Sequence, residues 1–405
     1  MSPSKRRLWS LAGPAALALA VAALLVQLVW ALDAPVKTDY LPFATGARVL
    51  QSDPGCMYCQ DVQASQQAAI LGYTPTAGFP KPFVNPPLVA WALQPLSGLP
   101  LRTGLVALLA VLLAALAASL LLAERLLPRD WPDGKRIVVA AAGLISLPAA
   151  TALGLAQWAP LLVLAALGAL ALLRRDRAVA AGVLLSVLLI KPQTVWLVLP
   201  ALAAARSWRV LLGVAAGAGG WLATGLLLVG PSQMLQLPRL ILERHVGEAT
   251  RTAGLPGLVS DIFGSGGAAF VAAVAMGLLA LAVLVRVRGV LRGRPAVAIA
   301  LGVAASLAFA PHVFPDDLML LAVCAVMWAP MAPAGAIAAM LAVSAAYQLD
   351  GWLPSPLAHL TPFALLGVLV GMALSLRARG AEGVPVATRT RLATGEARRA
   401  TTAPS

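Results

Sequence analysis

Long runs of apolar residues alternate with short polar segments along most of this chain. The first run follows three basic residues and continues from Leu8 to Leu32 without a charged side chain. A helix needs about 20 apolar residues to cross the hydrocarbon core of a bilayer. The pattern predicts about twelve membrane-spanning helices, near residues 8–32, 101–123, 137–153, 158–173, 178–190, 193–205, 210–229, 268–285, 296–310, 317–332, 334–349 and 360–376.

Composition supports this interpretation and excludes a water-soluble globular protein. Hydrophobic residues make up 60% of the 405 residues and charged residues only 11%. Soluble domains carry about 25% charged residues, which cover their surface in water. The expected fold class is therefore an all-α, polytopic membrane protein.

Basic residues concentrate in every second polar segment. With the N-terminus inside, 22 of the 30 lysines and arginines fall on the inner side. Cytoplasmic loops carry such an excess, so both termini are expected in the cytoplasm. The net charge of +14 thus indicates orientation and not a nucleic-acid-binding surface. The inner basic segments are 5–7, 125–136, 174–177, 206–209, 286–294 and 377–399.

Two long segments are expected on the outer, periplasmic side, at about 33–100 and 230–267. Residues 84–100 are apolar but interrupted by prolines, which predicts a helix lying on the outer membrane surface. No clear cleavage site follows the first apolar run, so it is expected to be retained as a span. The membrane domain is expected to cover residues 1–376 and a disordered, arginine-rich cytoplasmic tail to cover 377–405.

The segment 178–205 has two interpretations. A single long span would reverse the orientation of everything before or after it. Two short spans that meet at Lys191-Pro192 keep Arg174 and Arg206 on the cytoplasmic side, and we prefer this division. A lysine between apolar segments needs a partner or water, and an anionic phosphate is a natural partner. The alternative is that Lys191 extends to the lipid headgroups.

Side chains suited to chemistry gather on the predicted outer side, whereas the apolar runs carry few ionisable groups. A channel or carrier would place such groups at mid-membrane. Asp39 directly follows the first span, where a partly solvated carboxylate can act as a general base. The alternative is an ordinary acidic residue beside a helix end.

Further candidates lie in short outer segments. Gln157 can hydrogen-bond a ligand, and Trp158 either stacks on a sugar or, as we prefer, belongs to an aromatic belt. His312 can bind phosphate or transfer protons. The following pair, Asp316 and Asp317, either holds a cation or caps a helix, and capping is favoured.

The second outer segment carries an expected amphipathic helix at 233–246, with Arg244 among its basic residues. It would bind the headgroup of an anionic lipid, or be attracted to the membrane surface in general. In the first outer segment, Asn85 and two prolines begin the expected surface helix, and a direct role for Asn85 is the less favoured alternative.

Motifs for cofactors are absent from the sequence. It has no phosphate-binding loop and no dinucleotide fingerprint, so neither ATP nor a nicotinamide cofactor is expected. Three cysteines are too few for a four-cysteine zinc site. Cys56 and Cys59 are expected to form a local disulfide in an oxidising compartment. We expect no metal and no other cofactor.

The chain carries several motifs in a fixed order: Asp39-Tyr40 with Phe43-Ala44, Asn85-Pro86-Pro87 with Gln94-Pro95-Leu96, Gln157, Lys191-Pro192 followed by Arg206-Ser207-Trp208-Arg209, and Pro311-His312 with Asp316-Asp317. In this order they resemble glycosyltransferase family 87, a family of membrane mannosyltransferases with the GT-C fold that use polyprenol-phosphate sugars. The resemblance covers about residues 8–330. The family usually has Gly-Gln where this chain has Ala156-Gln157.

The resemblance implies a hexosyltransferase in the cytoplasmic (plasma) membrane of a bacterium, with its active site facing the periplasm. It implies transfer of mannose from a polyprenyl-phosphate-linked donor to a glycolipid or cell-envelope glycan. The alternatives are an arabinofuranosyltransferase with the same type of donor, a transporter of lipid-linked sugars and a non-catalytic assembly protein. The predicted roles are general base for Asp39, donor-phosphate binding for Lys191, His312 and Arg244, and substrate binding for Tyr40, Gln157 and Asn85.

Overall fold

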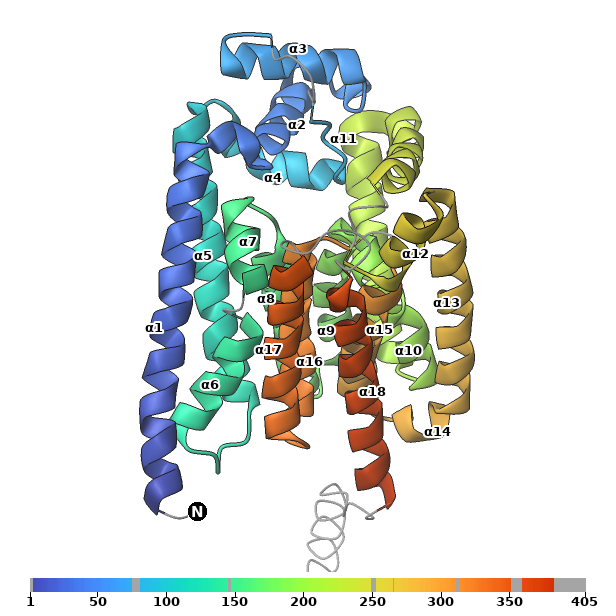
Figure 1. Cartoon of the computed structure of the whole chain (residues 1–405). Helices are drawn as coiled ribbons and strands as arrows, with labels where there is room; N and C mark the ends of the chain where they lie inside the picture. Colours follow the sequence, from blue (N-terminus) through green and yellow to red (C-terminus); the bar gives the residue numbers. More distant parts are fainter. Residues whose placement is uncertain are drawn as a thin grey trace, which may run out of the picture.

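The computed structural model describes residues 3–74, 81–144, 147–248, 253–264, 266–310, 313–350 and 359–381. Over these residues the chain is helical without a β-strand, which confirms the predicted all-α class. Most helices lie in one bundle, and a cap covers one end of it (Figure 1). The cap consists of α2 (Tyr40–Ser52), α3 (Gln60–Leu71) and α4 (Pro87–Ser97).

Several helices of the bundle are long and apolar, as in a membrane protein. The longest are α1 (Pro3–Asp33), α5 (Leu101–Leu126), α11 (Trp208–Glu248), α13 (Gly266–Arg286) and α18 (Leu360–Ala381). Among the described residues, four helices have the length and composition to cross a bilayer. These are Leu101–Leu126, Trp208–Ile241, Gly266–Arg286 and Leu360–Ala378.

Helix α1 covers the first predicted span, and most of the other predicted spans are helical but shorter or divided. One expected span, 137–153, is divided between two helices, and 317–332 begins as a 3-10 helix. Helices this short do not cross a bilayer alone, so the number of twelve spans stays a prediction. The remaining elements are α6 (Asp133–Leu144), α7 (Leu147–Gly154), α8 (Ala159–Leu173), α9 (Ala178–Leu185), α10 (Val198–Ala204), α12 (Leu255–Phe263), α14 (Arg288–Leu291), α15 (Pro295–Phe309), α16 (Leu321–Trp328) and α17 (Pro333–Asp350).

The predicted break at Lys191-Pro192 is confirmed. After α9 the chain continues as a 3-10 helix, η3 (Ser186–Ile190), and Lys191 then leaves the helical conformation with φ −127° and ψ 73°. Pro192 begins the next short turn, η4 (Pro192–Thr194). A proline disfavours the helical conformation of the residue before it, so this dipeptide ends the helix.

Two glycines bring α9 and α11 into close contact. A Cβ atom on Gly182 would lie 2.0 Å from the Val210 carbonyl oxygen, and one on Gly213 would lie 2.1 Å from the Val179 carbonyl oxygen. Small residues allow such backbone contact between helices in membranes. The contact fixes α9, which leads directly to Lys191, against the long α11.

The cap is held by buried amide side chains and a disulfide. Gln63 accepts a hydrogen bond from the Phe83 N–H (2.7 Å) and donates to the Met57 carbonyl (2.9 Å). The predicted disulfide between Cys56 and Cys59 is present and closes the turn before α3. The predicted surface helix corresponds to α4, which packs on α2.

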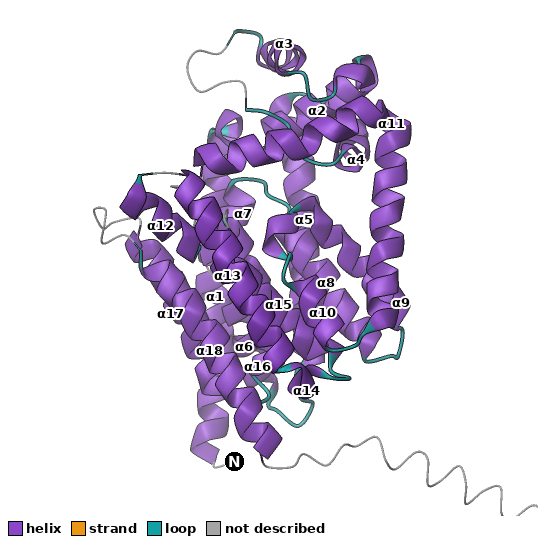
Figure 2. Ribbon diagram, turned by 90° about the vertical axis from the view of Figure 1, so that its right-hand side faces the viewer, coloured by secondary structure: helices purple, strands orange, loops and turns teal. Residues whose placement is uncertain are grey.

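Helix α11 extends beyond its predicted span and reaches the cap (Figure 2). Its backbone leaves the helical conformation at Gly230, with φ 78° and ψ 170°, and continues as helix to Glu248. The expected amphipathic helix at 233–246 is this upper part. It binds the cap, since the Tyr58 N–H donates to the Gln233 side chain (2.9 Å). At the other end of the chain, α18 continues five residues into the expected tail, to Ala381.

Candidate active site

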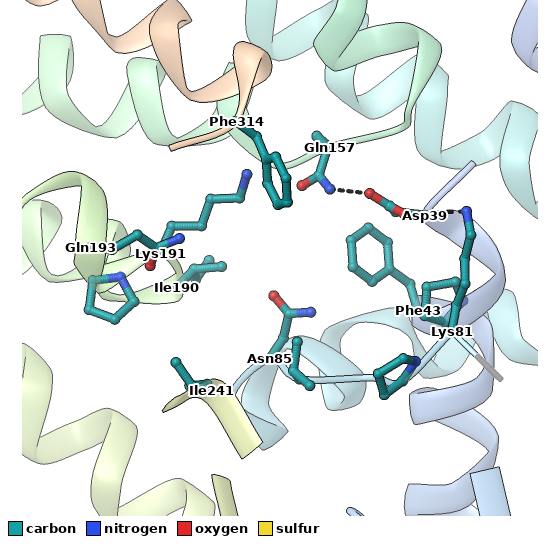
Figure 3. Close-up of a pocket in the computed structure, with 14 residues that line it drawn as sticks. Asp39, Phe43, Lys81, Asn85, Gln157, Ile190, Lys191, Gln193, Ile241 and Phe314 are labelled. Carbon is teal, nitrogen blue, oxygen red and sulfur yellow. Dashed lines mark hydrogen bonds and ion pairs between the residues drawn. The ribbon is translucent and has the colours of Figure 1, made fainter. Parts of the chain in front are cut away.

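A cavity lies between the cap and the bundle. It encloses about 760 Å³ of empty space when its open mouth is included. Figure 3 shows Asp39 and Lys81 on one side, Lys191 and Gln193 on the other and Phe314 between them. The lining residues are Asp39, Pro42, Phe43, Lys81, Pro82, Val84, Asn85, Gln157, Ile190, Lys191, Pro192, Gln193, Ile241 and Phe314.

Asp39 is positioned by the turn that joins α1 to the cap. Pro35 begins a short 3-10 helix, η1 (Pro35–Lys37), and its carbonyl accepts the Thr38 hydroxyl (2.7 Å). The Asp39 N–H donates to the Leu155 carbonyl (2.9 Å), which joins this turn to the end of α7. Asp39 then precedes α2, and its side chain is 27% exposed.

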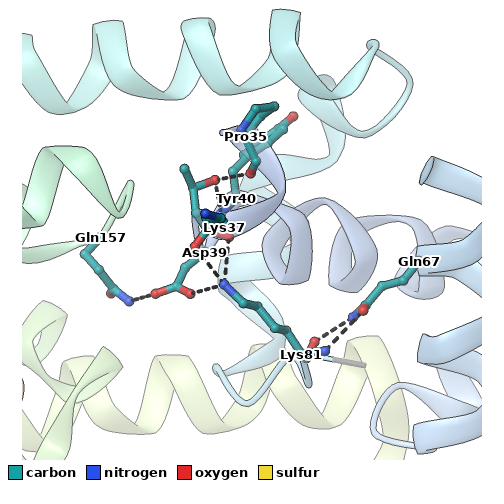
Figure 4. A network of polar contacts seen from close by, with 8 residues as sticks. Pro35, Lys37, Asp39, Tyr40, Gln67, Lys81 and Gln157 are labelled. Carbon is teal, nitrogen blue, oxygen red and sulfur yellow. Dashed lines mark hydrogen bonds and ion pairs between the residues drawn. The ribbon is translucent and has the colours of Figure 1, made fainter. Parts of the chain in front are cut away.

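Two side chains contact the Asp39 carboxylate (Figure 4). The Gln157 amide donates a hydrogen bond to one oxygen. The Lys81 ammonium lies 3.7 Å from the other oxygen and also donates to the carbonyls of Lys37 (2.8 Å) and Thr38 (3.4 Å). Gln67 holds the backbone of Lys81 through two hydrogen bonds. The carboxylate is therefore fixed in direction but keeps a free side toward the cavity.

The surroundings of Asp39 favour a general base. Burial raises the pKa of its carboxyl above the ordinary value. Lys81, Gln157 and Lys191 lower this pKa, and the charge of Asp316 raises it. A base works best when its pKa lies near the working pH, so a raised pKa suits proton removal from a sugar hydroxyl.

The opposite wall carries a buried ion cluster. The Lys191 ammonium lies 2.6 Å from Asp316 and 2.7 Å from Asp317, whose side chains are almost completely buried. The second oxygen of Asp317 accepts the Phe314 N–H (3.0 Å), which confirms the predicted capping role for Asp317. Removing one member of such a buried cluster would leave uncompensated charge. The cluster fixes the helix break at Lys191 against the segment that carries Phe314.

Comparison with known families places this cavity in context. A family model for glycosyltransferase family 87 matches residues 83–315, which is more than half of the chain. The chain belongs to this family. No curated protein and no solved structure matches it. Family 87 membership makes the chain a glycosyltransferase, and the matched range contains Asn85, Gln157 and Lys191 but begins after Asp39.

The structure brings four of the seven predicted family 87 site residues to the cavity: Asp39, Asn85, Gln157 and Lys191. Tyr40 is not among the lining residues. Its ring is buried against Gly104, and its hydroxyl donates to the Leu96 carbonyl (3.2 Å). His312 lies outside the described residues, and Arg244 is described only as part of the α11 backbone. Trp158 is buried against Phe43, with ring centroids 4.8 Å apart, and not exposed in an aromatic belt.

Sequence reasoning missed Lys81 and the partners of Lys191. Lys81 lies in an irregular segment before α4, and no local pattern pointed to Asp39. The pairing of Lys191 with Asp316 and Asp317 joins positions 125 and 126 residues apart. The sequence did contain one indication of this pairing. A buried lysine requires an anionic partner, and these two carboxylates lie at the predicted outer end of a span. In the part of the chain that the structure describes, no group of three or more His, Cys, Asp or Glu side chains is arranged to hold a metal.

Proposed function

We propose that this glycosyltransferase moves a sugar, mannose, from a polyprenyl-phosphate-linked donor to a glycolipid or cell-envelope glycan. The reaction takes place at the outer face of the cytoplasmic membrane. The observation that carries the proposal is the Asp39 carboxylate at the cavity wall, oriented by Gln157 and Lys81.

Sugar transfer from a phosphate-linked donor needs one general base and a positively charged group beside the leaving phosphate. The acceptor hydroxyl attacks the anomeric carbon, its proton passes to Asp39, and the bond from that carbon to the phosphate oxygen breaks. The phosphate leaves with the electron pair, and the anomeric configuration is inverted. An attacking hydroxyl and a leaving phosphate on opposite faces of the sugar require their partners on opposite walls, as Asp39 and Lys191 are (Figure 3).

Binding of the donor phosphate requires more positive charge than Lys191 supplies. Its ammonium is paired with two carboxylates, which offset its positive charge. We assign additional contacts to His312, two residues before the cavity-lining Phe314, and to Arg244, one helical turn after the cavity-lining Ile241. A cationic group at the departing phosphate stabilises the charge that develops there.

A lipid-linked donor is supported by an apolar groove beside the cavity. The groove shares Ile190 with the cavity and follows α8 from Trp158 to Gly168, about 15 Å at the helical rise. Apart from the indole nitrogens of Trp91, Trp158 and Trp221, the side chains lining it are hydrocarbon. An isoprenoid chain fits such a surface because it gains apolar contact there while its phosphate enters the cavity.

A transfer assay tests the proposal. Purified protein is incubated with radiolabelled polyprenyl-phosphate-mannose and a lipid and glycan extract from the native host. Asp39→Asn should lower the rate by about 100- to 10,000-fold, because the general base is lost. Asp33→Asn is the matched control, since Asp33 is an exposed carboxylate at the end of α1. Full activity of a folded Asp39→Asn protein would refute the role of Asp39.

The donor is varied in the same assay. Transfer only from the corresponding arabinose donor would keep the mechanism and change the sugar. Movement of the labelled lipid across vesicle membranes without formation of a new bond would instead favour a transporter.

A further inference from the structure

A second polar cavity lies at the end of the bundle opposite the catalytic cavity. Helix α8 connects the two, since it begins beside Gln157 and ends at Arg174, about 22 Å away at the helical rise. The second cavity holds about 1370 Å³ with its mouth included. Its walls come from the end of α5, the segment leading to α6, the end of α8 and the turn after α16.

Five arginines surround this cavity, and among the described residues only Arg136 has an acidic partner. They are Arg125, Arg129, Arg136, Arg174 and Arg175. Arg136 pairs with two carboxylates, Glu124 (2.9 Å) and Asp133. Within the described residues no ion pair joins any of the other four to an acidic side chain.

Helix ends offset only part of this charge. The Arg174 guanidinium donates a hydrogen bond to the Leu126 carbonyl at the end of α5. The C-termini of α5 and α8 each carry about half a negative charge, and the effect decays within a turn. These four arginines are exposed, and together they form a positively charged site that attracts an anion. Guanidinium groups bind phosphate oxygens through paired hydrogen bonds, which makes phosphate the best-matched anion.

The apolar part of the cavity wall indicates where the phosphate comes from. Leu122 and Ala171 line it beside the arginines. Leu122 also borders the apolar groove along α8, so apolar surface leads directly away from the charged group. This combination matches a lipid, whose phosphate is attached to hydrocarbon chains, and basic pockets between membrane helices bind lipid headgroups in this way.

We propose that this arginine cavity binds the phosphate group of an anionic phospholipid at the face of the membrane opposite the active site. The site does not depend on the identity of the transferred sugar or on the role of Asp39. Its occupant neutralises the four unpaired guanidinium groups and fixes the ends of α5 and α8. Because α8 starts at the Gln157 turn, an occupied site also stabilises the helix that supports the catalytic cavity.

Lipid binding is tested on full-length protein in detergent by native mass spectrometry. Phosphatidylglycerol is the anionic probe and phosphatidylcholine the neutral one. The wild-type protein should retain phosphatidylglycerol, and the triple variant Arg125→Gln/Arg129→Gln/Arg175→Gln should bind it at least tenfold more weakly. The matched control, Arg286→Gln/Arg288→Gln/Arg292→Gln, removes equal charge from the basic segment 286–294. This control should bind phosphatidylglycerol as the wild type does.

Four further results decide the proposal. Equal losses in the two triple variants would overturn it, because general attraction to basic loops would then explain the binding. Protection against heat by inorganic phosphate alone, equal to that by phosphatidylglycerol, would overturn the lipid source and identify the ligand as free phosphate. The triple lysine variant Arg125→Lys/Arg129→Lys/Arg175→Lys keeps the charge and should retain most of the binding. If the glutamine variant does not fold, loss of binding in Arg175→Gln alone supports the site and wild-type binding overturns it.

Discussion

Lys81 contacts both the Asp39 carboxylate and the backbone of the turn that carries Asp39. Its ammonium contacts the carboxylate and two carbonyls of the same turn, so one side chain both orients and stabilises the ionised form of the proposed base. Burial acts in the opposite direction and raises the pKa of Asp39. The balance between these two effects determines the pH range in which Asp39 can accept a proton.

Replacing Lys81 by methionine should shift the acid limb of the pH profile of kcat/KM to higher pH. The lost positive charge no longer lowers the pKa of Asp39, so the carboxyl stays protonated, and inactive, over a wider acidic range. We expect the rate at each pH on that limb to fall, because a smaller fraction of the enzyme carries the ionised base. Lys81→Arg keeps the charge and should keep the limb. An unchanged limb in Lys81→Met would mean that Lys81 acts only on the backbone.

Some residues of the site were predictable one by one, and others were not. Asp39, Gln157 and Lys191 stand beside predicted span ends, where a polar side chain in an apolar chain is conspicuous. Tyr40 was assigned by its place in a motif, but the motif does not say which way a ring points. Its burial against Gly104 depends on the packing of α2 on α5, which no local pattern contains.

Three bundle helices end in the same way, each with a residue in the left-handed conformation that is not glycine. These residues are Ala156 after α7, Asp176 after α8 and Arg206 after α10, with φ of 58°, 58° and 54°. At each end the next N–H donates to the carbonyl five residues earlier, as from Ser207 to Leu202. Glycine is the usual residue here because it adopts this conformation without steric cost.

Arg206→Gly should therefore stabilise the protein. The left-handed conformation costs a residue with a Cβ atom about 1–2 kcal/mol, and glycine loses part of this gain through its greater freedom in the unfolded chain. We expect a net gain of about 0.5–1 kcal/mol, measured as a higher unfolding midpoint in detergent. Arg206 is exposed, so no packing is lost. Arg206→Ala is the control, and an equal rise in that variant would assign the effect to the lost charge.

Among the helices, those with a strong local signal were predicted and those without it were not. The break at Lys191-Pro192 follows from proline geometry, and α4 and the upper part of α11 follow from their apolar patterns. The division of 137–153 and the helices α2, α3 and α12 were not specified. Helix α3 is polar and buries two glutamines, so its stability comes from partners in the cap and not from its own pattern.

For the whole molecule, the alternation of basic segments predicts that the cap faces the exterior and α14 the cytoplasm. Figure 1 shows these two parts at opposite ends of the bundle. Cysteine labelling can test this, because the native background is low: Cys56 and Cys59 form a disulfide and Cys324 is buried. Tyr73, just after α3, is 56% exposed, and a side chain on Gly289 in α14 would meet open space.

We expect a membrane-impermeant maleimide to label Tyr73→Cys in intact cells and to label Gly289→Cys only after the membrane is opened. The inner side carries most of the basic residues, and their excess opposes transfer across the membrane during insertion. The labelling also constrains the chemistry, because the cavity lies directly beneath the cap and its donor must be present on the side that the cap faces. The reverse labelling pattern would put the cavity at the cytoplasmic face and would contradict transfer at the outer face of the membrane.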